Sequence, residues 1–429
     1  MIEKIRSYLK SKNMDQFEVF YNKSNNFDLE VASNKIDQAS EGLTEGIFVR
    51  VLKDKKLGAA STLNIKNYKK CVDTAIKIAK INEIDKDFKS FPTKEKYSKV
   101  RECYKSLIDF DIENARDYLN RMMELTVKNE ITVPRAFYTK TIEETRVINS
   151  EGVDLERKNV INSADLELLE GKNTISIDDA SVFPLEPDYK AKEALDRINS
   201  LRNMGKIGTQ TLPVILHPDA LSRLLEHSFT FSINAENVQK HKSILSGKLN
   251  KKIMDKRITI EDAALKEGLI NTRRGDDEGT PSKVIKIVED GILKSFIHSS
   301  YTANKEGIKS TGNAFRGIQS IPAISTTNLI FSKGDKDNPI KELKKGIYVR
   351  EVLGAHTMNA ITGDFSVGVL EGHYVENGEI KHALKDTMIA GNLLELLNNV
   401  NCIGKKIYNC SNAMYLPEIL FNKVKVIGQ

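Results

Sequence analysis

Long segments in which apolar and polar residues alternate dominate the first part of the chain, and a period of two requires a sheet. The segment QFEVFYNKSNNFDLEVASNK, residues 16–35, alternates in this way, which predicts strands with one buried face. Its polar run Ser24-Asn25-Asn26 predicts a turn, so we expect two strands here. The segment GIFVRVLKDKKLGAAST predicts two more, joined around Asp54-Lys55-Lys56.

Helical periodicity interrupts these strands at three places. Residues 68–81 carry apolar side chains at i, i+3, i+4 spacing, which predicts a helix of about four turns. A second helix is expected near Ile112–Lys128, with Asp111 as its N-cap, and a third near Glu186–Met204. The segments RAFYTKT, ETRVINS and GVDLERKNVIN lie between the second and third helices and alternate again, with a turn signal at residues 149–152.

The second half begins with a strand, TLPVILH, and a helix for which Pro218 suits the first position. Beyond Ile253 the pattern is rich in strands, with hairpins predicted at Asp290-Gly291 and Asn377-Gly378. We therefore expect an α+β fold. Residues 1–205 would form a domain of mixed sheet and helices, and residues 206–429 a β-rich, barrel-like domain.

Composition excludes several classes of protein. The chain has 429 residues, of which 40% are apolar and 29% charged, as in a globular protein with its own core. A net charge of +6, spread along the chain, does not favour nucleic-acid binding. The four cysteines form no C-x-x-C pair, the first residues lack a signal-peptide pattern, and no long apolar run predicts a membrane span. We expect a cytoplasmic protein.

The stretch RLLEHSFTF, residues 223–231, resembles an altered zinc motif. The motif H-E-x-x-H places two histidines one helical turn apart, with a glutamate beside the first. Here Glu226 precedes His227, and phenylalanine follows one turn later at position 231. The inverted motif H-x-x-E-H would need a histidine where Arg223 stands.

Other residues offer weaker candidates. Glu226, His227, His241 and Cys410 have side chains that can bind zinc, although their spacing does not require a site, and structural or solvated histidines are the alternative. The acidic segment GDDEGTPS is either an exposed turn or a loop lining a cleft. The candidate cleft residues are His227, Asp276, Asp277, Glu278, Thr280 and Asn313.

Three long segments together resemble the family of TldD and PmbA (TldE) proteins, once called modulators of DNA gyrase. They are LTEGIFVRVLKDKKLGAAST, DDEGTPSKVIKIVEDGILKSFIHSSYTANKEGIKSTGNAFR and ITGDFSVGVLEGHYVENGEIKHALKDTMIAGNLLELLNNV. The resemblance covers almost the whole chain in order. It implies an α+β N-terminal part and a barrel-like C-terminal part.

The resemblance also implies a zinc site in one branch of the family. TldD-like members carry H-E-x-x-x-H and a C-terminal cysteine, whereas PmbA-like members lack the histidines. In this sequence the first ligand position is Glu226, the general-base position is His227 and the second ligand position is Phe231. Cys410 falls near the third. The texts AITGDFS and MIAGNL are closer to the PmbA branch.

The resemblance therefore implies a PmbA/TldE-like subunit of a cytoplasmic zinc-dependent peptidase that acts on unfolded peptides. No catalytic residue or metal is expected in this chain, and zinc is expected in the partner subunit. The partner would be a TldD-like paralogue in a heterodimer, or a second copy in a homodimer. Two alternatives stay open: an active metallopeptidase with a displaced metal site, and a non-enzymatic regulator of the gyrase-modulator type.

Overall fold

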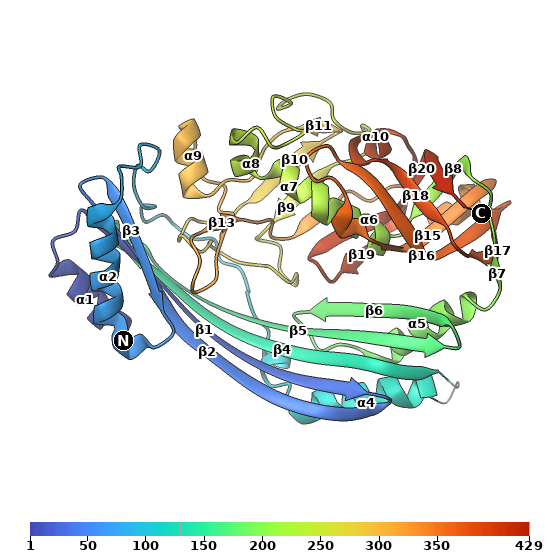
Figure 1. The fold of residues 1–429 in the computed structure, drawn as a ribbon, viewed down its shortest axis with the longest axis horizontal. Coiled ribbons are helices and arrows are strands. Elements are labelled where there is room, and N and C mark those ends of the chain that lie inside the picture. Colours follow the sequence, from blue (N-terminus) through green and yellow to red (C-terminus); the bar gives the residue numbers. More distant parts are fainter. Residues whose placement is uncertain (128–130, 429) are drawn as a thin grey trace.

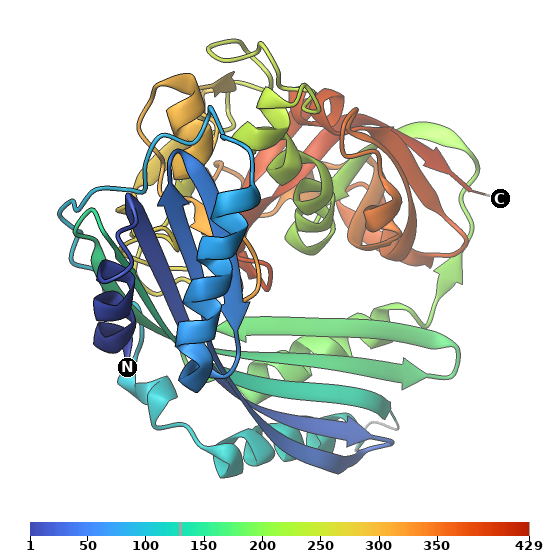
Figure 2. The same ribbon diagram turned by 60° about the vertical axis from the view of Figure 1, so that its left-hand side comes forward.

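Two large sheets and one two-stranded sheet build the protein, as the computed structural model of residues 1–127 and 131–428 shows (Figure 1). The first sheet is antiparallel, six-stranded and strongly curved, with the order β3-β2-β1-β4-β5-β6. Figures 1 and 2 show the C-terminal domain over one face of this sheet and α4 on the other. The strands are β1 (Gln16–Ala32), β2 (Lys35–Lys53), β3 (Lys56–Thr62), β4 (Thr132–Asn149), β5 (Asp154–Glu170) and β6 (Asn173–Ser181).

The turn predicted at Ser24-Asn25-Asn26 is wrong, because β1 is one continuous strand. These three residues pair with β2 on one side and with β4 on the other. Backbone hydrogen bonds to both neighbours outweigh the local preference of serine and asparagine for turns. The chain reverses instead at Ser33 and Asn34, whose φ angles of 49° and 64° are those of a tight hairpin turn.

Other local predictions have mixed outcomes. The turn at Asp54-Lys55-Lys56 is confirmed, since β2 ends at Lys53 and β3 begins at Lys56. The turn at residues 149–152 is also confirmed, because it joins β4 to β5. RAFYTKT and ETRVINS, however, are parts of the single strand β4 and not separate strands. Long continuous strands thus replace some of the short ones expected.

The three predicted helices of the N-terminal domain are present. Helix α2 spans Tyr68–Ile81 and buries its apolar face against the β1–β3 end of the sheet. Helix α4 spans Ile112–Val127, and the Asp111 carboxylate accepts the Asn114 N–H across 3.0 Å; the predicted end at Lys128 lies outside the described residues. Helix α5 (Pro187–Ser200) stops short of Met204. Two further helices are α1 (Ile2–Lys10) and α3 (Lys105–Ile108).

The C-terminal domain contains a closed β-barrel, which confirms the α+β fold with a barrel-like second domain. Each strand of the ring β8-β15-β16-β18-β20 is hydrogen-bonded to its neighbours, and β20 returns to β8. The hairpins at Asp290-Gly291 and Asn377-Gly378 are confirmed. The ring strands are β8 (Gln210–Leu216), β15 (Lys345–Leu353), β16 (Asp364–Glu376), β18 (Met388–Asn392) and β20 (Met414–Ile427).

Shorter elements surround the barrel. The chain segment that connects the two domains precedes the barrel in the sequence. Strand β6 ends at Ser181 and β7 begins at Met204, with α5 between them packed against the N-terminal core. A boundary at 205 stays a prediction. Within residues 1–127 and 131–428, no helix is long and apolar enough to cross a membrane. Further strands and α-helices are β7 (Met204–Gly205), β9 (Ile260–Ala263), β10 (Val284–Glu289), β11 (Ile292–Leu293), β12 (Ala314–Phe315), β13 (Ala323–Ile324), β14 (Leu329–Phe331), β17 (Glu379–Leu384), β19 (Val400–Cys410), α8 (Ala235–Gln239), α9 (Ser300–Glu306) and α10 (Leu393–Asn398).

A fully buried cluster of charges joins the two domains. Glu18 of β1 binds Arg50 of β2 at 2.7 Å and Arg316 of the C-terminal domain at 2.6 Å. Arg50 also reaches Glu278 at 3.0 Å. Burial favours a raised pKa for Glu18, but the charges of Arg316 and Arg50 hold its pKa below the ordinary value. These ion pairs fix how the sheet and the barrel domain lie against each other.

Candidate functional site

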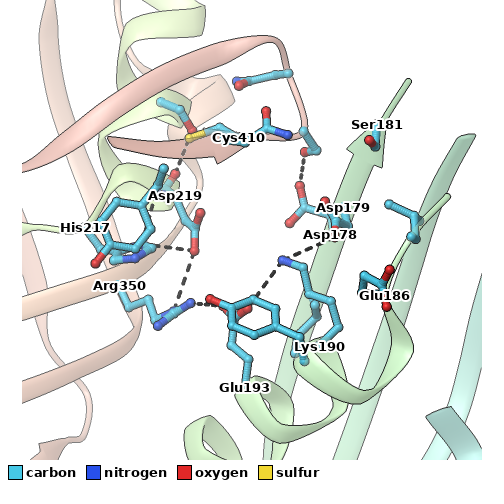
Figure 3. Close-up of a pocket in the computed structure, with 18 of the residues that line it drawn as sticks. Asp178, Asp179, Ser181, Glu186, Lys190, Glu193, His217, Asp219, Arg350 and Cys410 are labelled. Atoms are coloured by element: carbon cyan, nitrogen blue, oxygen red, sulfur yellow. Dashed lines mark hydrogen bonds and ion pairs between the residues drawn. The ribbon is translucent and has the colours of Figure 1, made fainter. Parts of the chain in front are cut away.

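A pocket of about 540 Å³ lies between the two domains (Figure 3). The N-terminal domain contributes the edge strand β6 and helix α5 to its wall. The C-terminal domain contributes the start of α6, one residue of β15, and the end of β19 with the turn that follows. Its charged lining residues are Asp178, Asp179, Glu186, Lys190, Glu193, Arg197, Asp219, Arg223, Arg350 and Lys406.

Helix α6 enters this pocket directly from a barrel strand. It spans Pro218–Leu224, and Pro218 occupies the first helical turn as predicted. His217 lies between β8 and the helix, and its Nδ1 lies 3.2 Å from the Asp219 backbone nitrogen. Leu221 and Leu224 pack into the barrel core and hold the helix in place. The polar start of α6 therefore faces the pocket while its apolar side faces the barrel.

A π-helical turn follows α6 at Leu225–Phe229, and α7 (Thr230–Ile233) continues the helix. Residues five apart on an α-helix differ by about 140° in direction, so Glu226 and Phe231 would point apart. A π turn has i→i+5 hydrogen bonds and therefore more residues per turn. It brings positions 226 and 231 closer to one face, as the spacing H-x-x-x-x-H would need for two metal ligands.

Of the four positions that the family resemblance assigns to the zinc site, Glu226 and Cys410 are connected through Asn412. Glu226 is exposed, and its Oε2 accepts a hydrogen bond of 3.1 Å from Asn412, two residues after Cys410. His227 and Phe231 are half-buried. Cys410 is buried at the end of β19. Burial raises the pKa of its thiol to about 12, although a hydrogen bond with Ser222 opposes this.

These residues do not fit a three-ligand zinc site. Phe231 offers no donor atom, so at most two of the three ligand positions implied by the family resemblance carry a side chain that can bind zinc. His241 is exposed in the turn after α8 and has a φ of 54°. Throughout the described residues, no group of three His, Cys, Asp or Glu side chains is placed to hold a metal ion.

A polar network instead fills one side of the pocket (Figure 3). His217 Nδ1 lies 3.0 Å from Asp219 Oδ2, and Arg350 Nε lies 3.6 Å from the same oxygen. Burial works to raise the pKa of Asp219, but the hydrogen bond from His217 and the charge of Arg350 hold it well below the usual range. Asp219 is thus a carboxylate at neutral pH. Arg350 continues the network to Glu193 on α5.

The opposite wall also carries paired charges. Lys190 of α5 lies 3.5 Å from Asp179 and 3.4 Å from Glu193. Asp178 accepts a hydrogen bond from Ser411 across the domain boundary, and Asn409 donates to the Ala180 carbonyl at 3.2 Å. These contacts tie β6 to the β19–β20 turn. The pocket is consequently polar, and several of its charges are paired with neighbouring side chains.

The acidic loop lies elsewhere, and its side chains are buried. Asp276 accepts the N–H groups of Glu278, Thr280 and Ala314, which together shape the loop. Asn313 donates to Asp262 Oδ2 at 2.6 Å. The expectation of an exposed acidic turn is wrong, because Asp276, Asp277 and Glu278 are each at most 3% exposed. They pack between the domains, where ion pairs and backbone N–H groups replace water.

The six residues predicted to line a cleft do not line the first pocket. Among the six predicted cleft residues, the structure places only Asp277 on a cavity wall, that of a second, smaller cavity. His227 lies on the π turn beside the first pocket but does not line it. The residues that do line it, such as His217, Asp219 and Arg350, were not predicted. The sequence signal that could have identified them is HPD, residues 217–219, which lies where the carboxyl end of a strand meets a helix N-terminus.

Comparisons with known proteins agree along the chain. The family model described as PmbA/TldA metallopeptidase C-terminal domain matches residues 209–428, and that for domain 1 matches residues 17–79. An uncharacterized protein of Methanocaldococcus jannaschii is 32% identical over 400 residues, which cover 91% of this chain and 93% of that protein.

Named relatives lead to the same family. The metalloprotease PmbA homolog of Buchnera aphidicola is 26% identical, with 100% of this chain and 97% of that protein covered. The crystal structure of TldE from Thermococcus kodakarensis superposes with a TM-score of 0.92 and 26% identity, and all of both chains is covered. The closed barrel, the curved sheet and these matches lead to one conclusion: the chain belongs to the PmbA/TldD metallopeptidase family.

Proposed function

We propose that this chain is a PmbA/TldE-type subunit of a cytoplasmic zinc-dependent peptidase, without a catalytic metal of its own. Its role is to complete the peptide-binding cleft of a TldD-like paralogue that carries H-E-x-x-x-H. The observation that carries the proposal is the side chain at position 231. The family resemblance assigns the second ligand position to Phe231 of α7, just after the π turn, and phenylalanine cannot bind zinc.

The contacts after Cys410 support the same proposal. Asn412, two residues after Cys410, donates a hydrogen bond of 3.1 Å to Glu226. The hydrogen bond from Asn412 to Glu226 thus joins the β19–β20 turn to the π turn, and no metal ion is needed for this contact.

The pocket favours an extended peptide as ligand. Strand β6 is at one edge of its sheet, paired with β5 alone among the described strands, and Ile177, Asp178, Asp179 and Ser181 of β6 line the pocket. An edge strand can bind a peptide through main-chain hydrogen bonds without reading its sequence. This property suits a subunit that holds unfolded peptides of varied sequence.

The two alternative functions have less support. An active metallopeptidase with a displaced site would need Glu226, His227, His241 and Cys410 to converge, and the described residues contain no such cluster. A gyrase-type regulator would need a surface for nucleic acid. The net charge of +6 over 429 residues gives little basis for that.

The test is reconstitution. The purified chain, the TldD-like paralogue and their mixture are assayed for zinc content, for mass by light scattering and for hydrolysis of an unfolded peptide. We expect zinc and the active site to come with the paralogue, and a stable complex to form through a large interface. A chain that alone retains one zinc per molecule and hydrolyses the peptide would overturn the proposal and favour the displaced-site enzyme.

A further inference from the structure

A second cavity, of about 250 Å³, lies between the concave face of the N-terminal sheet and loops of the C-terminal domain. None of the described residues lines both this cavity and the first pocket. Phe315 is 55% exposed, whereas Thr272, Arg273 and Thr327 are buried. The exposed Phe315 ring therefore borders a cavity whose wall also carries hydroxyl groups and the guanidinium groups of Arg157 and Arg273.

Arg273 is the unusual member of this wall. It is only 9% exposed, and its side chain makes one hydrogen bond within the described residues, from Nη2 to the Gly312 carbonyl at 3.3 Å. Its Nε has no partner there. Burial lowers the pKa of Arg273, and the nearby charge of Asp277 only partly offsets that effect. An arginine that is buried without a carboxylate partner is costly to the folded protein.

The carboxylates that line the cavity already contact other groups, and none of them forms an ion pair with Arg273 among the described residues. Asp277 pairs with Arg157 and accepts the Arg316 N–H at 2.9 Å. Glu102 accepts the Arg274 N–H at 2.7 Å. Glu143 accepts a hydrogen bond of 2.6 Å from Asn22 on β1. A guanidinium with free donor capacity thus remains at a cavity wall.

We propose that this cavity binds the carboxylate group of a small ligand, with Arg273 as its cation. A guanidinium presents N–H groups in a planar fork that matches a carboxylate. Thr326 adds a hydroxyl group to the wall, and Phe20 and Phe315 add apolar rings beside it. At about 30 Å³ per water, the volume corresponds to roughly eight waters, which suits an acid of the size of a short peptide end.

The carboxylate has two possible sources, a peptide C-terminus and a free organic acid. Melting temperatures of the full chain are measured with N-acetyl-dialanine, with its C-terminal amide, with acetate and with inorganic phosphate. Binding to the folded state raises the melting temperature. We expect the free acid to raise it and the amide to leave it unchanged. Acetate acting as well as the dipeptide acid indicates an organic acid, and the dipeptide acid acting alone indicates a peptide end.

Two variants of equal charge change assign the effect to one residue. Arg273→Gln should weaken binding of N-acetyl-dialanine by about tenfold or more, since a charge-assisted hydrogen bond is lost. Arg274→Gln should bind as the wild type does, because Arg274 does not line the cavity. Without ligand, Arg273→Gln should be as stable as the wild type or more so, because an unpaired buried charge has been removed.

A fluorescent reporter gives a measurement that does not depend on the folding of Arg273→Gln. The chain has no tryptophan, so Phe315→Trp places a single indole at the cavity mouth. Its emission should change saturably with the dipeptide acid and not with the amide. The proposal is overturned if neither carboxylate acts at millimolar concentration, if phosphate acts equally, or if Arg273→Gln retains binding. It is independent of the peptidase proposal, whose test is zinc content and activity with the paralogue.

Discussion

Asn412 donates a hydrogen bond of 3.1 Å to Glu226, and this contact joins the helix that follows α6 to the turn that follows Cys410. Residues 186 positions apart in sequence therefore meet beside the pocket between the domains. Glu226 stands at the position that the family resemblance assigns to the first zinc ligand. Position 226 and the turn after Cys410 thus lie side by side, and in this chain a hydrogen bond between protein side chains joins them.

Restoring the ligands should restore zinc binding. The triple variant Glu226→His, His227→Glu and Phe231→His writes H-E-x-x-x-H onto the π turn, with Cys410 as the third ligand. Because Phe231 is only half-buried, its loss should cost less than the about 3–5 kcal/mol typical of a fully buried phenylalanine. We expect one zinc per chain by elemental analysis and a raised melting temperature. Adding Cys410→Ala should abolish both; a folded triple variant without zinc would contradict the assignment.

The Cys410 thiol should react slowly in the folded protein. With a pKa of about 12, its thiolate fraction at pH 8 is about 10⁻⁴, against roughly a quarter for an unperturbed cysteine. Iodoacetamide labelling followed by mass spectrometry should therefore show alkylation roughly a thousandfold slower at Cys410 in buffer than in urea. Cys103, which is half-buried, is the internal control and should be labelled first. Equal rates at the two cysteines in buffer would exclude the buried, protonated thiol.

Removing Glu18 should destabilise the fold strongly. Glu18→Gln takes the anion from between Arg50 and Arg316 and leaves two buried guanidinium groups with less compensation. Breaking a buried ion pair in this way costs about 3–5 kcal/mol. Urea unfolding measures the loss. Glu3→Gln, at an exposed ion pair with Arg6, is the matched control and should change stability by less than about 1 kcal/mol. Similar losses in both variants would argue against a structural role for the cluster.

Glu351 should make stability depend on pH near neutrality. Burial raises its pKa to about 7, although the charge of Arg197 opposes this. A folded-state pKa above the unfolded value stabilises the protein at acid pH, and this contribution disappears as the pH rises from about 4.5 to about 7. Its size is at most about 3 kcal/mol. Glu351→Gln should flatten the fall in urea stability between pH 5 and 8, whereas Glu376→Gln, exposed at the end of β16, should leave it unchanged. Parallel curves for wild type and Glu351→Gln would refute the assignment.

The local sequence determined the elements that a short apolar period or a turn dipeptide can specify. The period of 3.6 between Tyr68 and Ile81 corresponds to α2, because one apolar stripe is enough to specify a helix against a sheet. Asp290-Gly291 and Asn377-Gly378 adopt the positive φ angles of tight turns, which these residues tolerate better than most others. The change in period also separated a mixed N-terminal domain from a strand-rich C-terminal one. The family resemblance located the π turn without indicating that it was one.

Tertiary structure alone decided which local signals prevailed and which residues met. Ser24 to Asn26 have the composition of a turn, yet β2 and β4 hydrogen-bond to them from both sides and keep them extended. Asp276 and Glu278 have the composition of an exposed loop, yet Arg50 and backbone N–H groups reach them and replace water. Arg350 contacts both Asp219 of the C-terminal domain and Glu193 of α5, because the two domains lie against each other. Such pairings depend on residues distant in sequence, and no local pattern records them.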